Sequence, residues 1–103
     1  MGRAEAYVED YLRKESRRRG WLCYKFVSPG RSGVPDDIIV TDRGVVAFVE
    51  CKSSTGRLSA LQVAQITHLQ EHQTIVRVVF SRDEVDKVLD DLDTRSTYSE
   101  EYE

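Results

Sequence analysis

The sequence lacks most of the features that mark membrane, secreted and disulfide-linked proteins. It contains two prolines, two cysteines and one methionine, and none of its apolar runs approaches the roughly 18 residues that a membrane-spanning helix needs. Its first residues are charged, whereas a signal peptide would be apolar there. Cys23 and Cys51 both lie in apolar runs typical of strands, which favours buried free thiols over a disulfide. We therefore expect a cytoplasmic protein that makes no contact with a membrane.

The composition is that of one ordinary globular domain. At 103 residues the chain is long enough for a single modest core and too short for two. Its content of 40% hydrophobic and 32% charged residues is typical of folded proteins and not of disordered ones. No internal repeat is visible in the sequence.

The charge is unevenly distributed along the chain. A net charge of −3 would argue against a nucleic-acid partner if it were spread evenly, but residues 1–57 hold 11 Lys and Arg against 8 Asp and Glu, whereas residues 58–103 hold 4 against 10. A local basic surface for nucleic acid is therefore compatible with an acidic protein. The run of Arg17, Arg18 and Arg19 has a second interpretation, because basic residues at a helix end also complement the helix dipole.

The pattern of apolar and turn residues predicts a small α/β domain. It indicates helices over residues 3–19, 59–72 and 82–92, and strands over 21–28, 37–41, 44–52 and 74–81. Turn residues 42–44 join the two middle strands into a hairpin. The predicted fold is a mixed sheet flanked by helices, in the order α-β-β-β-α-β-α. Residues 1–92 form the domain, and residues 93–103, which are acidic and show no periodicity, are expected to be a disordered tail.

Two carboxylates are predicted to meet at one end of the hairpin. Strand alternation places Glu50 and Lys52 on the same side of a run that is otherwise apolar on both faces, as in a central strand. An ion pair at the strand end would explain these two residues, but it does not explain Asp36, which the hairpin register brings opposite Glu50. Paired carboxylates repel one another unless a cation lies between them. A few hard oxygen ligands suit Mg²⁺ or Mn²⁺.

These residues together resemble a known nuclease signature. Pro35-Asp36 followed by Glu50-Cys51-Lys52, with Glu5 in a preceding helix, resembles the PD-(D/E)XK pattern. More narrowly, the chain is similar to the virus-type replication-repair nuclease (VRR-NUC) domain, since Gln62 ends the stretch GRLSALQ. The resemblance extends from Glu5 to about residue 92. It implies a restriction-endonuclease-like fold.

The resemblance also implies a role for each of these side chains. The metal ligands would be Asp36, Glu50, the backbone carbonyl of Cys51 and, directly or through a water, Glu5. Lys52 would orient or deprotonate the attacking water and contact the phosphate. Without the resemblance, Glu5 would be interpreted as a residue that compensates the dipole at the start of its helix.

Gln62 and Asp37 leave alternatives open. Ser59 and Gln62 form a capping-box pattern at the start of the second predicted helix, so Gln62 is either structural or a member of the catalytic set. The family usually has an apolar residue after Pro-Asp, where this chain has Asp37. Alternation places Asp36 and Asp37 on opposite faces, so only one of them can join the site, and the motif favours Asp36. Asp37 is expected to bind Arg31 or to cap the loop.

Several basic and hydroxyl side chains near these motifs are candidates for contacts to DNA phosphates. They are Lys25, Arg31, Ser53, Ser54 and Arg57. His68 and His72 have the spacing of a zinc-binding pair on a helix, but no second pair of ligands accompanies them in the sequence, so no zinc site is predicted.

The sequence therefore predicts a metal-dependent DNA endonuclease that uses Mg²⁺, with Mn²⁺ as a substitute. A chain this small offers little surface for holding branched DNA alone, and the second predicted helix is apolar on two sides, one of which packs on another helix or on a second copy. We expect a homodimer that cuts branched DNA such as four-way (Holliday) junctions. The alternatives are a flap-directed, general or restriction-type nuclease, or a non-cleaving DNA-binding protein on the same fold.

Overall fold

The computed structural model describes residues 3–101 and the side chains of residues 3–95. It has the predicted order of helices and strands. The elements are α1 (Arg3–Arg18), β1 (Leu22–Lys25), β2 (Asp37–Val40), β3 (Val46–Cys51), α2 (Ala60–Glu71), β4 (Ile75–Val79) and α3 (Arg82–Glu101). Each strand is shorter than the run that predicts it, because residues just outside the paired segment, such as Trp21, are also buried.

The four strands form a mixed sheet in the order β1-β2-β3-β4. β2 pairs antiparallel with both β1 and β3, whereas β3 and β4 are parallel. β3 is therefore a central strand, as predicted. In the β2–β3 hairpin Asp37 is opposite Val49, so the preceding residue, Asp36, reaches the level of Glu50. The predicted register of the hairpin is confirmed.

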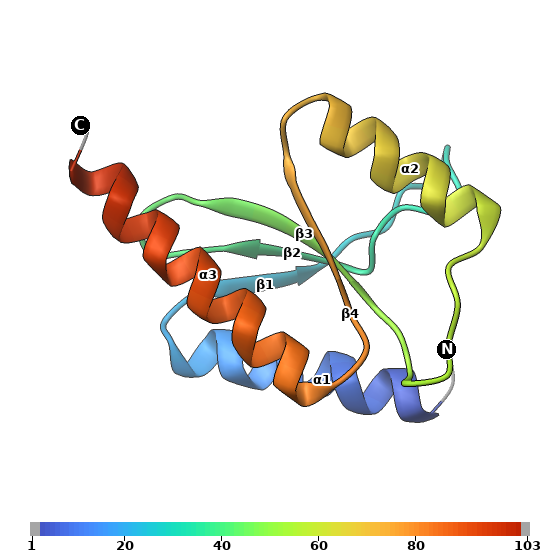
Figure 1. The fold of residues 1–103 in the computed structure, drawn as a ribbon, viewed down its shortest axis with the longest axis horizontal. Coiled ribbons are helices and arrows are strands. Elements are labelled where there is room, and N and C mark those ends of the chain that lie inside the picture. The colour runs from blue at the N-terminus through green and yellow to red at the C-terminus, as the bar shows by residue number, and fades with distance from the viewer. Residues whose placement is uncertain (1–2, 102–103) are drawn as a thin grey trace.

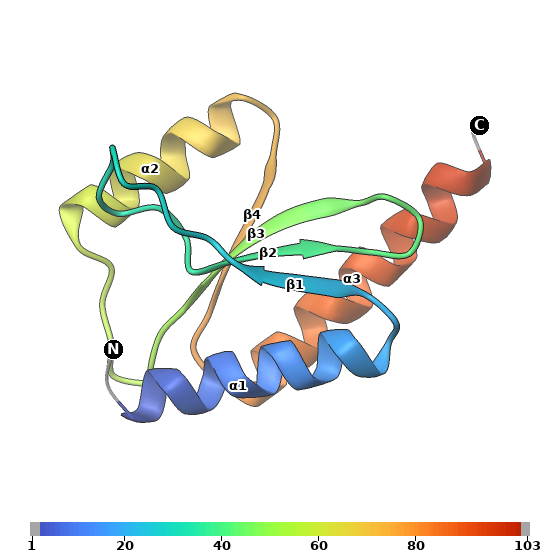
Figure 2. The same cartoon turned by 180° about the vertical axis from the view of Figure 1, so that it is seen from behind.

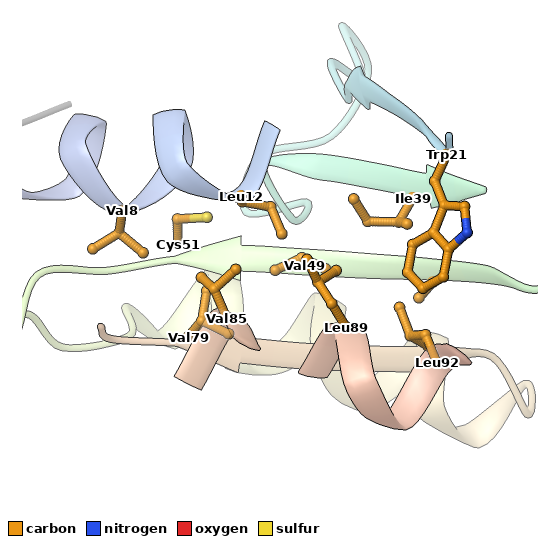
Figure 3. Close-up of a cluster of buried hydrophobic side chains, with 11 residues drawn as sticks. Val8, Leu12, Trp21, Ile39, Val49, Cys51, Val79, Val85, Leu89 and Leu92 are labelled. Carbon is orange, nitrogen blue, oxygen red and sulfur yellow. The ribbon is translucent and has the colours of Figure 1, made fainter. Parts of the chain in front are cut away.

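The helices lie on the two faces of this sheet. α1 and α3 cover one face and α2 lies over the other (Figure 1, Figure 2). The hydrophobic core fills the space between the sheet and the layer of α1 and α3, where Leu12, Val49 and Leu89 are fully buried (Figure 3). Alternate residues of β3, including Ala47 and Cys51, point into this core and are also fully buried. Both cysteines are free thiols, as predicted, but only Cys51 is buried and Cys23 is half-buried.

α2 covers only part of the opposite face. Ile66 of α2 is buried, and among the described strands the helix packs mainly against β4. The large apolar side chains left exposed here are Leu22, Tyr24 and Val46 on the sheet, and Leu61 and Val63 on the helix. The second apolar side of α2 is therefore not covered by another helix within the part of the chain that the structure describes.

α3 extends beyond the predicted helix. The predicted helix ended at residue 92, but α3 continues to Glu101, and residues 102–103 of the expected tail lie outside the described part. Apolar periodicity stops after Leu92 because the helix leaves the core there (Figure 1). Its next turn is stabilised locally instead, since Nε of Arg95 lies 3.0 Å from Oδ2 of Asp91. No helix in the described part of the chain is long and apolar enough to cross a membrane.

Candidate active site

Asp36 and Glu50 meet where β2 begins and β3 ends. Asp36 follows the buried Pro35, and its Oδ2 accepts a hydrogen bond from the backbone N–H of Cys51 at 2.9 Å. Glu50 is only 2% exposed. Burial, followed by the nearby charge of Asp36, raises the pKa of Glu50 to about 7. The hairpin register thus places two carboxylates beside one another at the end of a buried strand.

Lys52 brings a positive charge to these carboxylates. Its Nζ lies 3.8 Å from Oε2 of Glu50, and its side chain is 10% exposed. The backbone N–H of Lys52 donates to the carbonyl of Val79 on β4 at 2.9 Å, which continues the pairing of β3 and β4 past the end of β3. The lysine is therefore held by a paired strand and not by a free loop.

Gln62 contacts both the start of α2 and the carboxylate site. Ser59 Oγ accepts a hydrogen bond from the N–H of Gln62 at 3.1 Å, and Gln62 Oε1 accepts one from the N–H of Ser59 at 2.8 Å. The predicted capping box is therefore present. The other end of the same amide, Nε2, donates to Oε2 of Glu50 at 3.1 Å. Capping the helix does not prevent this side chain from reaching the site.

The oxygen atoms of this cluster suit a hard cation. Oε1 of Glu50 is buried and has no hydrogen-bond partner among the described residues, and the carboxylate of Asp36 lies beside it. No three His, Cys, Asp or Glu side chains gather as a metal-binding group within residues 3–95. A cation at this position would therefore take its remaining ligands from backbone carbonyls and water. Such a donor set suits Mg²⁺ or Mn²⁺ better than zinc.

Glu5 lies near this cluster without joining it. It is in the first turn of α1 and is partly buried. Its charge adds to the rise in the pKa of Glu50, after the larger effects of burial and of Asp36. Among the described residues, the carboxylates of Glu5, Asp36 and Glu50 do not come close enough together to form a metal-binding group. The structure therefore brings Asp36 and Glu50 together and leaves Glu5 at the margin of the site.

Both the sequence and the fold match known proteins. A family model for the VRR-NUC domain matches residues 7–83. The chain belongs to the VRR-NUC family. It is 40% identical over 74 residues to "Putative nuclease p44" of Acyrthosiphon pisum secondary endosymbiont phage 1, across 70% of this chain and 80% of that protein. A solved structure described as a VRR_NUC domain is 30% identical, with a TM-score of 0.81, over 86% of this chain and 97% of its own. The resemblance found in the sequence is confirmed, and the chain is a nuclease domain with the expected α/β fold.

Asp37 of this VRR-NUC domain lies on the opposite face from Asp36, as alternation predicts. The expectation that it binds Arg31 or caps the loop is wrong. The side chain is fully buried, and Nε of Arg13 on α1 lies 3.8 Å from its Oδ1. Neither carboxylate oxygen accepts a hydrogen bond from another described residue. The group beside Asp37 is the carboxylate of Glu9, to which a protonated Asp37 can donate. Burial, followed by a proton shared with Glu9, raises the pKa of Asp37 to about 8.

Glu9 and Arg13 are the site neighbours that sequence reasoning missed. Glu9 is 3% exposed, and its Oε2 lies 2.9 Å from Nζ of Lys25 and 3.0 Å from a terminal nitrogen of Arg13. Lys25, a candidate for DNA contact, is therefore already paired. The sequence does contain a sign of this pairing. Glu9 lies between Val8 and Leu12 on the buried side of α1, and a buried carboxylate needs a partner.

Three candidate DNA-binding residues of the VRR-NUC domain lie within five positions after Lys52. Ser53, Ser54 and Arg57 lie in the turn between β3 and α2, in which the N–H of Gly56 donates to the carbonyl of Ser53 at 2.9 Å. Ser54 and Arg57 are exposed and Ser53 is half-buried. This turn therefore presents hydroxyl and guanidinium groups next to the carboxylate site.

Arg31 lies on a second loop, which runs from β1 to β2 and is docked on α2. Gly33 has a φ of +88°, and a Cβ at this position would lie 2.6 Å from the carbonyl oxygen of Leu61. Only glycine permits this close approach of loop and helix. Arg31 lines a hollow of about 290 Å³ beside α2, together with Gln65, His68 and His72. The loop ends at Pro35, directly before the first carboxylate of the site.

Proposed function

We propose that this VRR-NUC domain is a Mg²⁺-dependent DNA endonuclease in which Mn²⁺ can replace Mg²⁺. The observation that carries the proposal is the meeting of Asp36, Glu50 and Lys52 at paired strand ends, with one oxygen of Glu50 buried and unpartnered among the described residues. Hydrolysis of a phosphodiester requires charge neutralisation at the phosphate and an oriented water. Two adjacent carboxylates and a lysine are suited to both tasks.

The carboxylate side of the site would hold the cation. Its ligands are Asp36, Glu50 and the backbone carbonyl of Cys51, with Glu5 contributing directly or through a water. When bound, the cation neutralises charge on the scissile phosphate and lowers the pKa of water. The chain itself contributes rigid placement, because the N–H of Cys51 fixes one oxygen of Asp36 at 2.9 Å.

Lys52 and Gln62 would act on the other side of Glu50. Lys52 orients or deprotonates the attacking water and contacts the phosphate. Gln62 holds Glu50 in place by donating from Nε2 to Oε2 at 3.1 Å, which leaves Oε1 without a protein partner among the described residues. Because Gln62 is fixed in turn by its capping box with Ser59, the Glu50 carboxylate is oriented by the fold itself.

The two loops beside the site would contact the DNA backbone. Arg31 approaches from the loop docked on α2, and Ser53, Ser54 and Arg57 approach from the turn after β3. Guanidinium and hydroxyl groups bind phosphate oxygens without reading base sequence. These contacts therefore favour recognition of DNA shape.

We further propose that the substrate is branched DNA, such as a four-way junction, and that the acting unit is a homodimer. A symmetric four-way junction offers two equivalent cleavage positions, whereas one chain carries one site. The half-covered sheet face and the outer side of α2 leave Tyr24 58% exposed and Val63 48% exposed, with other large apolar side chains nearby. Exposed apolar surface of this kind is typical of an interface, and a second copy with two-fold symmetry would cover it.

A cleavage panel tests the nuclease proposal. Labelled linear duplex, flap, fork and four-way junction are each incubated with the full chain in Mg²⁺, Mn²⁺ or EDTA. We expect cleavage in both metals, none in EDTA, and the fastest cleavage on the junction. Cleavage in EDTA would contradict metal dependence, and equal cleavage of all four substrates would indicate a general nuclease. Binding without cleavage in any condition would indicate a DNA-binding protein on a nuclease fold.

Light scattering coupled to size-exclusion chromatography tests the homodimer. We expect the mass of two chains for the wild type and of one chain for Tyr24→Glu and Val63→Glu, because each places a charge in the apolar surface. Lys87→Glu, on the exposed side of α3, is the matched control and should remain dimeric. A monomeric wild type that still prefers junctions would remove dimerisation from the proposal.

A further inference from the structure

Lys25 is held by a nearly buried carboxylate. It is the last residue of β1, and its Nζ lies 2.9 Å from Oε2 of Glu9. The same oxygen lies 3.0 Å from a terminal nitrogen of Arg13, and the side chain of Glu9 is only 4% exposed. α1 therefore provides a fixed anchor for the lysine at the end of β1.

The ammonium group of Lys25 also lies beside Asp36. Its Nζ is 4.0 Å from Oδ1 of Asp36, while Oδ2 of Asp36 accepts the hydrogen bond from the N–H of Cys51 at 2.9 Å. The backbones of the same two segments are tied together, because the N–H of Phe26 donates to the carbonyl of Asp36 at 2.8 Å. One oxygen of the Asp36 carboxylate thus lies beside the ammonium group of Lys25, and the other accepts a hydrogen bond from the backbone of Cys51.

We propose that Lys25 is a positioning residue for Asp36 and not a contact to DNA. Anchored on Glu9, its ammonium group fixes the rotation of the Asp36 carboxylate and offsets part of the negative charge that Asp36 and Glu50 bring together. Groups that surround metal ligands commonly orient them through hydrogen bonds and charge, and this keeps the geometry of a site rigid. The inference rests on the proposed function, since that function places Asp36 in the cation-binding site.

A phosphate contact by Lys25 is disfavoured by the same geometry. To reach a phosphate, Nζ would have to leave Glu9, whose carboxylate would then keep Arg13 as its only nearby cation among the described residues. The Lys25 side chain is itself 46% exposed, but its partner Glu9 is buried, and removing one partner from a buried charge is costly. Arg31 and Arg57 are exposed on the two loops and are the better phosphate ligands.

Steady-state cleavage separates positioning from DNA contact. The panel substrate that is cut fastest is used with Lys25→Met, Lys25→Arg and, as a matched control, Lys14→Met at an exposed position of α1. We expect Lys25→Met to lower kcat about tenfold or more while KM for DNA changes by less than about twofold. Lys25→Arg should restore most of kcat, because a guanidinium can still bridge Glu9 and Asp36. A raised KM with unchanged kcat would overturn the proposal.

A double variant tests whether Lys25 and Glu9 act as one unit. Glu9→Gln removes the anchor, so it should also lower kcat, and adding it to Lys25→Met should change kcat by less than about twofold further. Losses that multiply in the double variant would contradict the anchored arrangement. Thermal unfolding shows whether each variant is folded. If Glu9→Gln does not fold, the comparison of Lys25→Met with Lys25→Arg decides whether Lys25 is a positioning residue.

DNA binding distinguishes failure of this inference from failure of the proposed function. Fluorescence anisotropy with Ca²⁺ in place of Mg²⁺ gives the affinity across a series of salt concentrations. Loss of one phosphate-contacting lysine would reduce the slope of log affinity against log salt by about 0.9, whereas we expect Lys25→Met to leave the slope unchanged. A reduced slope would overturn the inference whether or not the protein cuts. A wild type that cuts no substrate would refute the proposed function, and the slopes would still decide whether Lys25 contacts phosphate.

Discussion

The side-chain amide of Gln62 joins the first turn of α2 to Glu50. Its nitrogen donates to Oε2 of Glu50 at 3.1 Å, and its oxygen accepts from the N–H of Ser59 at 2.8 Å. The orientation of the amide is therefore set by both contacts, since reversing it would break each one. A capping residue ordinarily stabilises only its helix, but Gln62 also fixes the position of the Glu50 carboxylate.

Gln62→Glu should separate these two contacts. The variant keeps an oxygen that can accept from Ser59, but it replaces the donor to Glu50 with a second carboxylate. We expect a cleavage rate lower by about tenfold or more and a free energy of unfolding within about 1 kcal/mol of wild type. Ser59→Ala is the matched variant, and it should lose about 1 kcal/mol of stability while retaining cleavage. Urea unfolding and initial cleavage rates measure both. Equal loss of cleavage in Ser59→Ala would show that the cap, and not the contact to Glu50, is what the reaction needs.

Asp36→Asn, Glu50→Gln and Lys52→Ala should each abolish cleavage while the protein stays folded and binds DNA. The first two remove negative charge from the proposed cation site, and the third removes the group proposed to orient the water. Gel-based cleavage assays, circular dichroism and fluorescence anisotropy give the three readouts. Full activity of Lys52→Ala would exclude the proposed role of that lysine.

Asp37→Asn is the control for the choice between neighbouring aspartates. Asp37 points away from Glu50 toward Arg13 and is fully buried, so we expect cleavage within about threefold of wild type. The same gel assay compares it with Asp36→Asn. An inactive Asp37→Asn beside an active Asp36→Asn would show that the other aspartate serves the site.

Asp37 should also make stability decrease as pH rises. Its pKa is raised from an ordinary value of 3.8 to about 8, first by burial and then by the proton shared with Glu9. Between these values the folded state holds a proton that the unfolded chain has released, so the free energy of unfolding falls across this window and levels off above it. The charged groups that face Asp37 are Glu9 and Arg13 from α1 and Lys25 from β1.

Asp37→Asn removes this titration. We therefore expect the Tm of the variant, relative to that of wild type, to increase from about pH 5 to about pH 8. Scanning calorimetry in EDTA measures this difference without a contribution from metal binding. Parallel curves of Tm against pH for the two proteins would contradict the shared proton.

Gly33→Ala should loosen the loop that leads to the site. Gly33 has a φ of +88°, and an added Cβ would lie 2.6 Å from the carbonyl oxygen of Leu61. We expect the free energy of unfolding to fall by about 1–3 kcal/mol, because both the backbone and the contact become strained. Gly30→Ala, in the same loop with nothing within 4 Å of the new Cβ, should stay within about 0.5 kcal/mol of wild type. Urea unfolding compares the two, and equal losses would show that the close approach to α2 is not the cause.

The sequence by itself determined the order of elements and the meeting of Asp36 with Glu50. Both follow from local rules, because alternation decides the face of each strand residue and the length of the turn decides the register. The same rules placed Asp37 on the other face and predicted the capping box of Ser59 and Gln62, and the structure confirms each of these.

Only the tertiary structure decided which groups surround those residues. The partners of Asp37 are Glu9 and Arg13, more than twenty positions away on α1, and the anchor of Lys25 is likewise a residue of α1. The end of α3 also differs from the prediction, since apolar periodicity reports contact with the core, whereas the turn after Leu92 is stabilised by the ion pair of Arg95 with Asp91 along the helix. Local periodicity specifies the face on which a side chain lies, but its partner depends on how α1 packs across the sheet.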